Sequence, residues 1–125
     1  MTQEDKELLL KDLCARLSYG VKVNEDIQGD FTLVGLTKER AFTTSEEEGK
    51  FNDFPIELIK PYLFPLSNMT EEQSKIYHEL IRGMFGTSAL INFEVLEDFF
   101  HKNHLDYRGL IPMGLALNAT ELNIY

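Results

Sequence analysis

The sequence lacks the features that mark an exported or membrane-embedded protein. Its 125 residues include a single cysteine, Cys14, so no disulfide can form within the chain. The first seven residues, MTQEDKE, are acidic and polar, without the basic and apolar regions of a secretory signal. No apolar run approaches the roughly 18 residues that a membrane span requires. These absences predict a cytoplasmic protein that makes no use of a membrane.

Positive charge is also scarce. Twelve Lys and Arg residues stand against 21 Asp and Glu residues, which gives a formal net charge of −9. Proteins that bind nucleic acid without regard to sequence gain much of their affinity from Lys and Arg side chains that neutralise phosphates. The composition therefore argues against a nucleic-acid partner.

Several catalytic motifs are absent as well. The chain contains no P-loop, no G-x-G-x-x-G turn and no G-x-S-x-G nucleophile elbow. Cys14 lies far in sequence from every histidine, among leucines on the apolar side of an expected helix, so we interpret it as a buried structural thiol. We therefore favour a non-enzymatic protein without a cofactor.

Enough apolar side chain is present to form a real core. Hydrophobic residues make up 43% of the chain, and nine Phe and five Tyr are among them. The pattern predicts a single α+β domain spanning residues 1–125. Its expected segments are a helix at 1–18, a small β unit at 20–66, two helices at 69–104 and an apolar tail at 105–125.

The first helix is predicted from helical spacing of apolar residues at positions 9, 10, 13, 14 and 17. Thr2 is suited to cap its start and Gly20 to end it. The β-type runs that follow, such as GVKV and DFTLVGLT, predict three or four antiparallel strands. We expect the acidic residues 46–48 to form a solvated hairpin tip. Together with the compact PIELIKPYLFPL, these strands resemble a small SH3-like barrel in architecture.

Two prolines and a capping box organise the middle of the chain. Pro61 and Pro65 predict that KPYLFP is a stiff, extended segment that crosses from the sheet to the helices. Thr70 and Gln73 form the sequence signature of a capping box, which begins a helix with an apolar face of Ile76, Tyr77, Leu80 and Ile81. After a loop, GMFGTSA, we expect Asn92 to cap a last helix that buries Phe93, Leu96, Phe99 and Phe100.

Polar residues cluster at 101–108, in HKNHLDYR. If the last helix reaches residue 104, then Glu97, His101 and His104 share one face and could ligate a metal ion. The alternative is that the helix ends near Asn103, where histidines interact favourably with the helix dipole and bond its free carbonyl groups. We favour this second interpretation over a metal site and over an acid–base role for the histidines.

The tail that follows is almost uncharged, because Glu121 is the sole charged residue among the last 17. Such a segment is expected either to pack on its own chain or to offer an apolar strip to a partner protein or a second copy. At its entry, Asp106 and Arg108 form a pair that clamps the turn, or Arg108 bonds free carbonyls at the helix end. The residues expected to make these structural or intermolecular contacts are Tyr62, Phe64, Asp106, Tyr107, Arg108, Leu110, Ile111 and Met113.

Three segments carry a family resemblance: DLCARLSYGVKV at 12–23, KPYLFPLSNMTEEQ at 60–73 and HLDYRGLIPMGLAL at 104–117. They resemble a group of short proteins of unassigned activity encoded by phages and mobile elements of gut bacteria. The chain departs from the group at Ser18, where proline is usual, and at Phe64, where arginine is common. The resemblance implies a cytoplasmic accessory protein of a mobile element and supplies no catalytic residues.

Three functional hypotheses follow. The leading one is an accessory protein that binds an unidentified protein, or itself, through the apolar tail and KPYLFP. The second is a nucleic-acid-associated protein or an acidic DNA mimic. Direct binding would use Phe31, Phe42 or Phe51 on the sheet and would need four cations, Lys22, Lys38, Arg40 and Lys50, on one face. The third is a metal-dependent enzyme at residues 97, 101 and 104.

Overall fold

A computed structural model of the protein describes residues 1–45, 49–83 and 89–125, with side chains described from residue 93 in the last range. The acidic residues 46–48 and most of the expected loop at 83–89 therefore lie outside the described residues. The elements in chain order are α1 (Gln3–Arg16), η1 (Leu17–Tyr19), β1 (Lys22–Glu25), β2 (Gly29–Leu36), β3 (Arg40–Thr44), β4 (Phe51–Pro55), η2 (Ile56–Leu58), β5 (Ile59–Pro65), η3 (Leu66–Asn68), α2 (Glu71–Gly83), α3 (Ala89–Lys102), β6 (Leu105–Asp106) and β7 (Leu117–Asn118).

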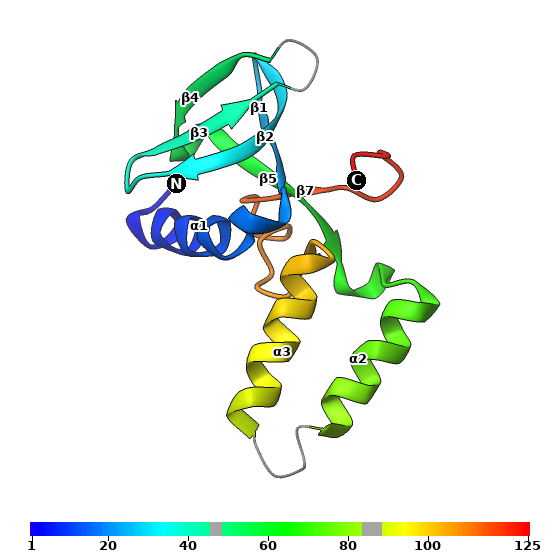
Figure 1. The fold of residues 1–125 in the computed structure, drawn as a ribbon. Helices are drawn as coiled ribbons and strands as arrows, with labels where there is room; N and C mark the ends of the chain where they lie inside the picture. The colour runs from blue at the N-terminus through cyan, green and yellow to red at the C-terminus, as the bar shows by residue number, and fades with distance from the viewer. Residues whose placement is uncertain (46–48, 84–88) are drawn as a thin grey trace.

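The architecture is the predicted α+β arrangement of an N-terminal helix, a mostly antiparallel sheet and two later helices. Figure 1 shows α1 lying along one end of the sheet, while α2 and α3 project away from it as a hairpin. The sheet order is β4-β3-β2-β1-β5-β6, and all neighbours from β4 to β5 are antiparallel. In the described part of the chain this path is open, because no pairing joins β4 to β5 to close a barrel.

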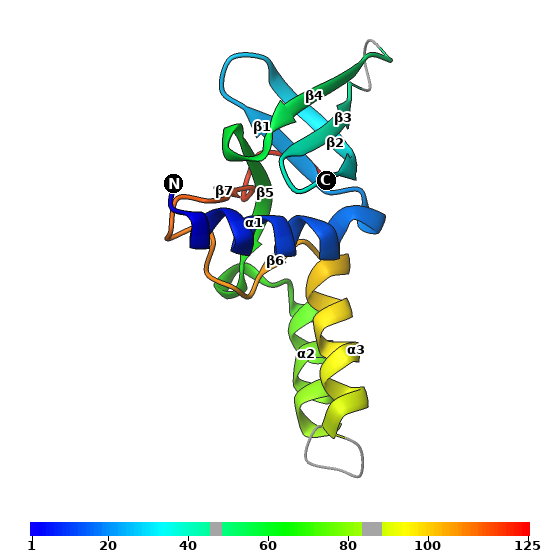
Figure 2. The same ribbon diagram turned by 90° about the vertical axis from the view of Figure 1, so that its left-hand side faces the viewer.

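Strand β5 is paired by three different strands. Its first half pairs with β1, from Ile59 to Pro61, and its second half pairs with β7 and β6. The Leu63 carbonyl accepts a hydrogen bond of 2.8 Å from the Ala119 amide, and the Phe64 amide donates one of 2.8 Å to the His104 carbonyl. These two groups belong to one peptide unit and point in opposite directions, so β7 and β6 lie on opposite edges of β5. The KPYLFP segment thus crosses from the sheet to the helices, as expected (Figure 2).

Helix α1 begins and ends where the sequence predicts. The Thr2 side chain accepts a hydrogen bond from the Asp5 amide, and Gly20 ends the helical segment with a φ of 68° that glycine adopts without strain. Its buried face, however, carries Leu9, Asp12, Leu13 and Arg16. Cys14 points away from this face and is exposed, so the prediction of a buried thiol is wrong.

The main core lies between α1 and the sheet. Leu9 and Leu13 of the helix meet inward-facing residues of the strands, and the buried cluster comprises Leu9, Leu13, Val21, Val23, Phe31, Leu33, Ala41, Ile56 and Ile59. Fully burying one aliphatic side chain of this kind stabilises the fold by about 1.5–3 kcal/mol. Truncating Leu13 to alanine would cost about 2–5 kcal/mol, since the cavity adds to the lost transfer free energy.

The α2–α3 hairpin begins with the predicted capping box. The Thr70 amide donates to Gln73 Oε1, and the Gln73 amide donates to Thr70 Oγ1, at 2.9 and 3.1 Å. The helices run antiparallel, because Gln73 Nε2 donates to Asn103 Oδ1 at one end and Tyr77 packs against Phe100 one turn further on.

Helix α3 differs from the prediction at its start. It begins at Ala89, so Asn92 lies within the helix and does not cap it. Phe93 is 48% exposed, whereas Leu96, Phe99 and Phe100 are buried as expected. The antiparallel register explains the difference, since the pairing of Gln73 with Asn103 puts Phe93 opposite Gly83, which has no side chain to cover it.

Candidate functional site

The polar residues of 101–108 meet two charged residues of α1 in a buried cluster, which we call the polar junction. It consists of Asp12, Arg16, His101, Asp106, Tyr107 and Arg108. Asp12 Oδ2 accepts a hydrogen bond of 2.8 Å from Arg16 Nε, and Asp12 Oδ1 accepts one of 3.1 Å from Arg108 Nε. The side chains of Asp12 and Arg16 are fully buried. One carboxylate therefore serves two guanidinium groups inside the protein.

The junction joins α1 to the end of α3. Arg16 Nη2 donates to the Leu105 carbonyl in β6, and the Tyr107 ring centroid lies 5.7 Å from Arg16 Cζ and 4.8 Å from Arg108 Cζ. The Tyr107 hydroxyl is hydrogen-bonded to His101 Nε2 at 2.8 Å. Burial, reinforced by Arg16, lowers the pKa of His101, and burial raises the pKa of Tyr107. Both side chains are thus held in their neutral forms at neutral pH.

Asp106 stabilises the turn that follows β6. Its two carboxylate oxygens accept hydrogen bonds from the amides of Leu110 and Ile111, at 2.8 and 2.9 Å. Arg108 pairs with Asp12 of α1 instead, so the expected Asp106–Arg108 clamp is wrong. The reason is that the two backbone amides satisfy Asp106 while the helix supplies a buried carboxylate for Arg108. Asp106 and Arg108 are thus consumed in holding the fold together, whereas His104 Nδ1 of the same segment is buried without a hydrogen-bond partner among the residues that the structure describes.

The structure does not bring Glu97, His101 and His104 together as metal ligands. Helix α3 ends at Lys102, and His104 adopts a φ of 55°, off the helical face that the hypothesis requires. Its ring stacks on Tyr125 with centroids 3.6 Å apart, and burial lowers the pKa of His104 to about 4. Within residues 1–45, 49–83 and 89–125, no group of three or more His, Cys, Asp or Glu residues is placed to hold a metal ion. The three residues are therefore not arranged as a ligand set.

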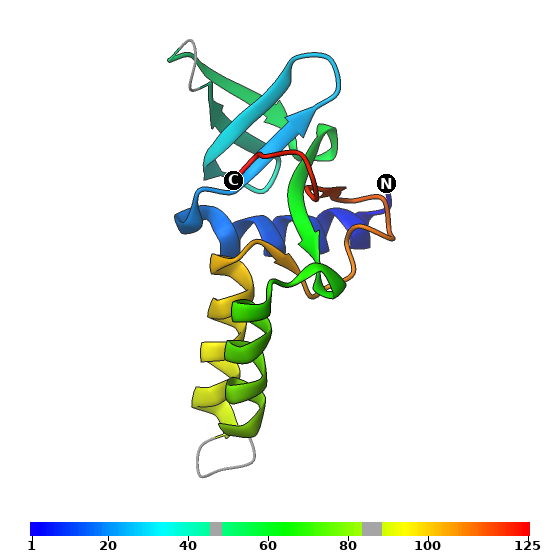
Figure 3. The same cartoon turned by 90° about the vertical axis from the view of Figure 1, so that its right-hand side faces the viewer.

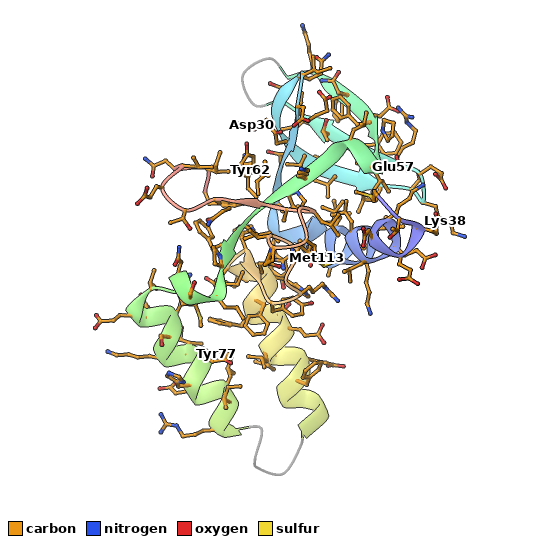
Figure 4. The ribbon with its side chains drawn as sticks, turned by 180° about the vertical axis from the view of Figure 1, so that it is seen from behind. Asp30, Lys38, Glu57, Tyr62, Tyr77 and Met113 are labelled. Atoms are coloured by element: carbon orange, nitrogen blue, oxygen red, sulfur yellow. The ribbon has the colours of Figure 1, made fainter. Side chains whose placement is uncertain are left out.

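The apolar tail packs on its own chain. Leu110, Leu115 and Ala116 form a buried cluster with Leu63 of β5, and Ile111 packs against it. Among the residues expected to make contacts, Met113 is exposed, at 48% (Figure 4).

The KPYLFP segment is also consumed internally. Tyr62 is buried, and its hydroxyl donates to Asp30 Oδ1 at 2.6 Å, a pair visible in Figure 4. Burial and this hydrogen bond raise the pKa of Tyr62 to about 12. Phe64 is half-buried against Tyr125, with ring centroids 5.9 Å apart. The core-facing residues of KPYLFP and of the tail are therefore buried within the protein, whereas Met113, Leu122 and Tyr125 remain 48%, 51% and 42% exposed.

The tail ends on the sheet. The Tyr125 hydroxyl accepts a hydrogen bond of 2.9 Å from the Lys22 amide and donates one of 2.8 Å to the Tyr62 carbonyl. It thereby bridges β1 and β5 at the point where these strands part. Burial raises the pKa of Tyr125, so its hydroxyl keeps its proton and both hydrogen bonds throughout the neutral range.

The four cations that a nucleic-acid platform requires do not gather on one face. Lys22 and Lys50 line a polar groove of about 810 Å³ beside Asp30, whereas Lys38 lines a separate hollow next to α1. Asp30 lies near the start of β2 and Lys38 lies just past its end, and Figure 4 shows the two well apart. Arg40 Nε lies 2.5 Å from Asp53 Oδ2 in an ion pair.

The three phenylalanines are likewise divided. Phe31 is buried against Phe54, whereas Phe42 and Phe51 are exposed on the outer side of the sheet. This arrangement offers a nucleic acid two exposed rings without the shared cationic surface.

Sequence reasoning missed an exposed apolar surface on the α2–α3 hairpin. Ile76 is 42% exposed and Val95 is 45% exposed, although both are large apolar side chains. Ile76 immediately precedes Tyr77, and Val95 immediately precedes Leu96, and these two residues face the neighbouring helix. In two antiparallel helices, the residues that directly precede the contacting residues point to the same side of the pair. Ile76 and Val95 therefore lie on the same side of the hairpin. We call this surface, formed by Ile76, Leu80 and Val95, the hairpin face.

The periodicity of α2 could have revealed this surface, because its apolar stripe is wider than one neighbouring helix can cover. In the described part of the chain, none of the helices has the length and apolarity needed to cross a bilayer. Comparison with known protein families, curated proteins and solved structures finds no match to the chain.

Proposed function

We propose that this protein is a non-enzymatic accessory protein that acts by binding another protein through the hairpin face. The observation that supports the proposal is the exposure of α2. Every residue of this helix is at least partly exposed, although its sequence is amphipathic, and Ile76 and Val95 leave apolar surface uncovered. Exposed apolar patches on a folded protein commonly mark contact sites.

The base of the hairpin is well anchored, which suits a docking arm. Asp98 of α3 is hydrogen-bonded to the Tyr19 hydroxyl, Gln73 bonds Asn103, and Arg16 holds the Leu105 carbonyl. Figure 3 shows the two helices extending from this base, away from α1 and the sheet. A preformed arm loses little conformational entropy on binding, and this favours affinity.

The docking surface proposed here differs from the tail and KPYLFP favoured by the sequence. The buried residues of those segments, such as Leu63, Leu110 and Leu115, are not available to a partner in the folded protein. The resemblance to proteins of phages and mobile elements adds a context to the proposal, namely an accessory role in the cytoplasm. It leaves the identity of the partner to experiment.

Site-specific photo-crosslinking in expressing cells tests the proposal. A photoreactive residue is introduced at position 76, at position 95 or, as a control, at Ile27, which is 88% exposed on the turn between β1 and β2. We expect the same discrete adduct from positions 76 and 95 and no such adduct from position 27. The adduct is identified by mass spectrometry and its binding reconstituted from purified components. Equal or absent crosslinking at all three positions would contradict the proposal.

A further inference from the structure

We propose that the hairpin face binds a basic amphipathic helix of a partner protein. This inference rests on the proposed function and adds the chemistry of the partner. It depends on the spacing of the exposed apolar residues, on the acidic residues beside them, and on the consequences of placing a second copy of the chain on the same surface.

The spacing of the hairpin face matches two turns of a helix. The register in which Gln73 meets Asn103 and Tyr77 meets Phe100 puts Val95 beside position 82 of α2. Ile76 and Val95 are therefore separated by about six residues along the axis, or about 9 Å, and half-buried Leu80 lies between them. A helix laid against α2 and α3 would meet these residues with anchors at positions i, i+4 and i+7. The partner helix would then form a three-helix bundle with α2 and α3.

The rim of the face is acidic. Glu72 and Glu79 are the i−4 and i+3 neighbours of Ile76, so their carboxylates flank it on the same side of α2. On α3, Asp98 and Lys102 follow Val95 by three and seven positions and offset each other in charge. Across residues 71–83 and 93–102, six carboxylates and three cationic side chains give a net charge of −3. A partner with Lys or Arg beside its apolar face complements this rim.

The same charges disfavour a second copy of the chain. A two-fold dimer through the hairpin face would bring Glu72 and Glu79 against the same residues of the other copy. Like charges placed together at an interface cost free energy, and each copy carries a net charge of −9. Charge complementarity therefore selects a basic partner over self-association.

Binding of a synthetic helical peptide tests the inference on the full chain. The probe has leucines at helical spacing and lysines elsewhere, and two control peptides carry glutamate in place of lysine or the same residues in scrambled order. Calorimetry and amide chemical shifts measure binding at low and high salt. We expect the lysine peptide to bind and to shift the amides around Ile76 and Val95, and its affinity to fall at least tenfold at high salt.

Matched variants decide where the peptide binds. We expect I76D and V95D each to weaken binding at least tenfold, and I27D, which adds the same charge at an exposed isoleucine elsewhere, to leave it unchanged. The E72K/E79K double variant should weaken the lysine peptide and let the glutamate peptide bind. If all variants bind alike, or the scrambled peptide binds equally well, the inference is wrong.

The outcomes also separate the partner class from the proposed function. Specific crosslinks at positions 76 and 95 with no peptide binding would leave the function standing and overturn the basic helix. Crosslinks to the chain itself, with a dimer in light scattering that I76D abolishes, would show a second copy as the occupant and overturn the basic helix as well.

Discussion

Arg16 of the first helix donates a hydrogen bond of 2.7 Å to the carbonyl oxygen of Leu105, 89 residues further along the chain. Asp12 orients this guanidinium through a hydrogen bond of 2.8 Å and also binds Arg108. A fully buried arginine is thereby shared between α1 and the segment that follows α3. The polar junction therefore joins the N-terminal helix α1 to residues 105 and 108, which follow α3.

Replacing Asp12 tests the junction. The Asp12→Ala variant leaves Arg16 buried without its carboxylate, and loss of one partner from a buried ion pair costs about 3–5 kcal/mol. We expect the free energy of unfolding, measured by urea denaturation, to fall by this amount. Asp26→Ala, in an exposed turn, is the matched control and should change the value by less than about 0.5 kcal/mol. A similar small effect for both variants would show that the junction contributes little.

The Tyr125 hydroxyl gives a second prediction. Tyr125→Phe keeps the ring that stacks on His104 but removes the bridge between the Lys22 amide and the Tyr62 carbonyl. We expect a loss of about 1–3 kcal/mol in unfolding free energy, because both backbone groups lose a partner. Tyr125→Ala should cost more, since the stack is lost as well. Equal stability of wild type and Tyr125→Phe would argue against the bridge.

The stability of the protein should fall on mild acidification. The pKa of His104 is lowered from 6.5 to about 4 by burial, so between these values the unfolded chain binds a proton that the folded chain does not. Stability therefore decreases as pH falls through this window, by less than the full shift implies because solvent screens the partly exposed ring.

A substitution at His104 isolates this contribution. Asparagine tolerates the positive φ of the position, so His104→Asn keeps the backbone while removing the titrating ring. Thermal unfolding between pH 7 and pH 4 should show a shallower slope for this variant than for wild type. Burial also lowers the pKa of His101, so part of the dependence of stability on pH remains in both proteins. Identical slopes would rule out His104 as the source.

Cys14 should behave as a surface thiol. It is exposed on α1, so a thiol reagent should react with the native protein about as fast as with the denatured protein. Cys14→Ser should change the free energy of unfolding by less than about 0.5 kcal/mol. Strong protection in the native state, released by denaturant, would contradict the exposed position.

The parts of the fold that were predicted correctly depend on local signals. Thr2 and the Thr70–Gln73 pair cap helices through hydrogen bonds to residues three positions away, so a short stretch of sequence contains the whole interaction. Alternating strands and turn residues likewise made the antiparallel sheet predictable. Class and element order follow from such signals.

The predictions were wrong where the group that determines whether a residue is buried lies far away in the sequence. The spacing of apolar residues predicted that Cys14 faces the protein core. The helix is instead rotated so that Asp12 and Arg16 are buried and Cys14 is exposed. These two charges pair with each other, and Arg108 and the Leu105 carbonyl add further hydrogen bonds from a distant part of the chain. No local sequence pattern indicates that these distant groups pair with the buried charges. The pairing of the tail with β5 escaped prediction for the same reason.

The position of β5 between β1, β7 and β6 has a consequence for synthesis on the ribosome. Asp12 emerges 96 residues before Arg108, which corresponds to about 5–20 s of translation. During that interval Asp12 lacks Arg108, Arg16 lacks the Leu105 carbonyl, and the second half of β5 has unpaired edges. The nascent chain is therefore open to chaperones and proteases until its last segment has been made.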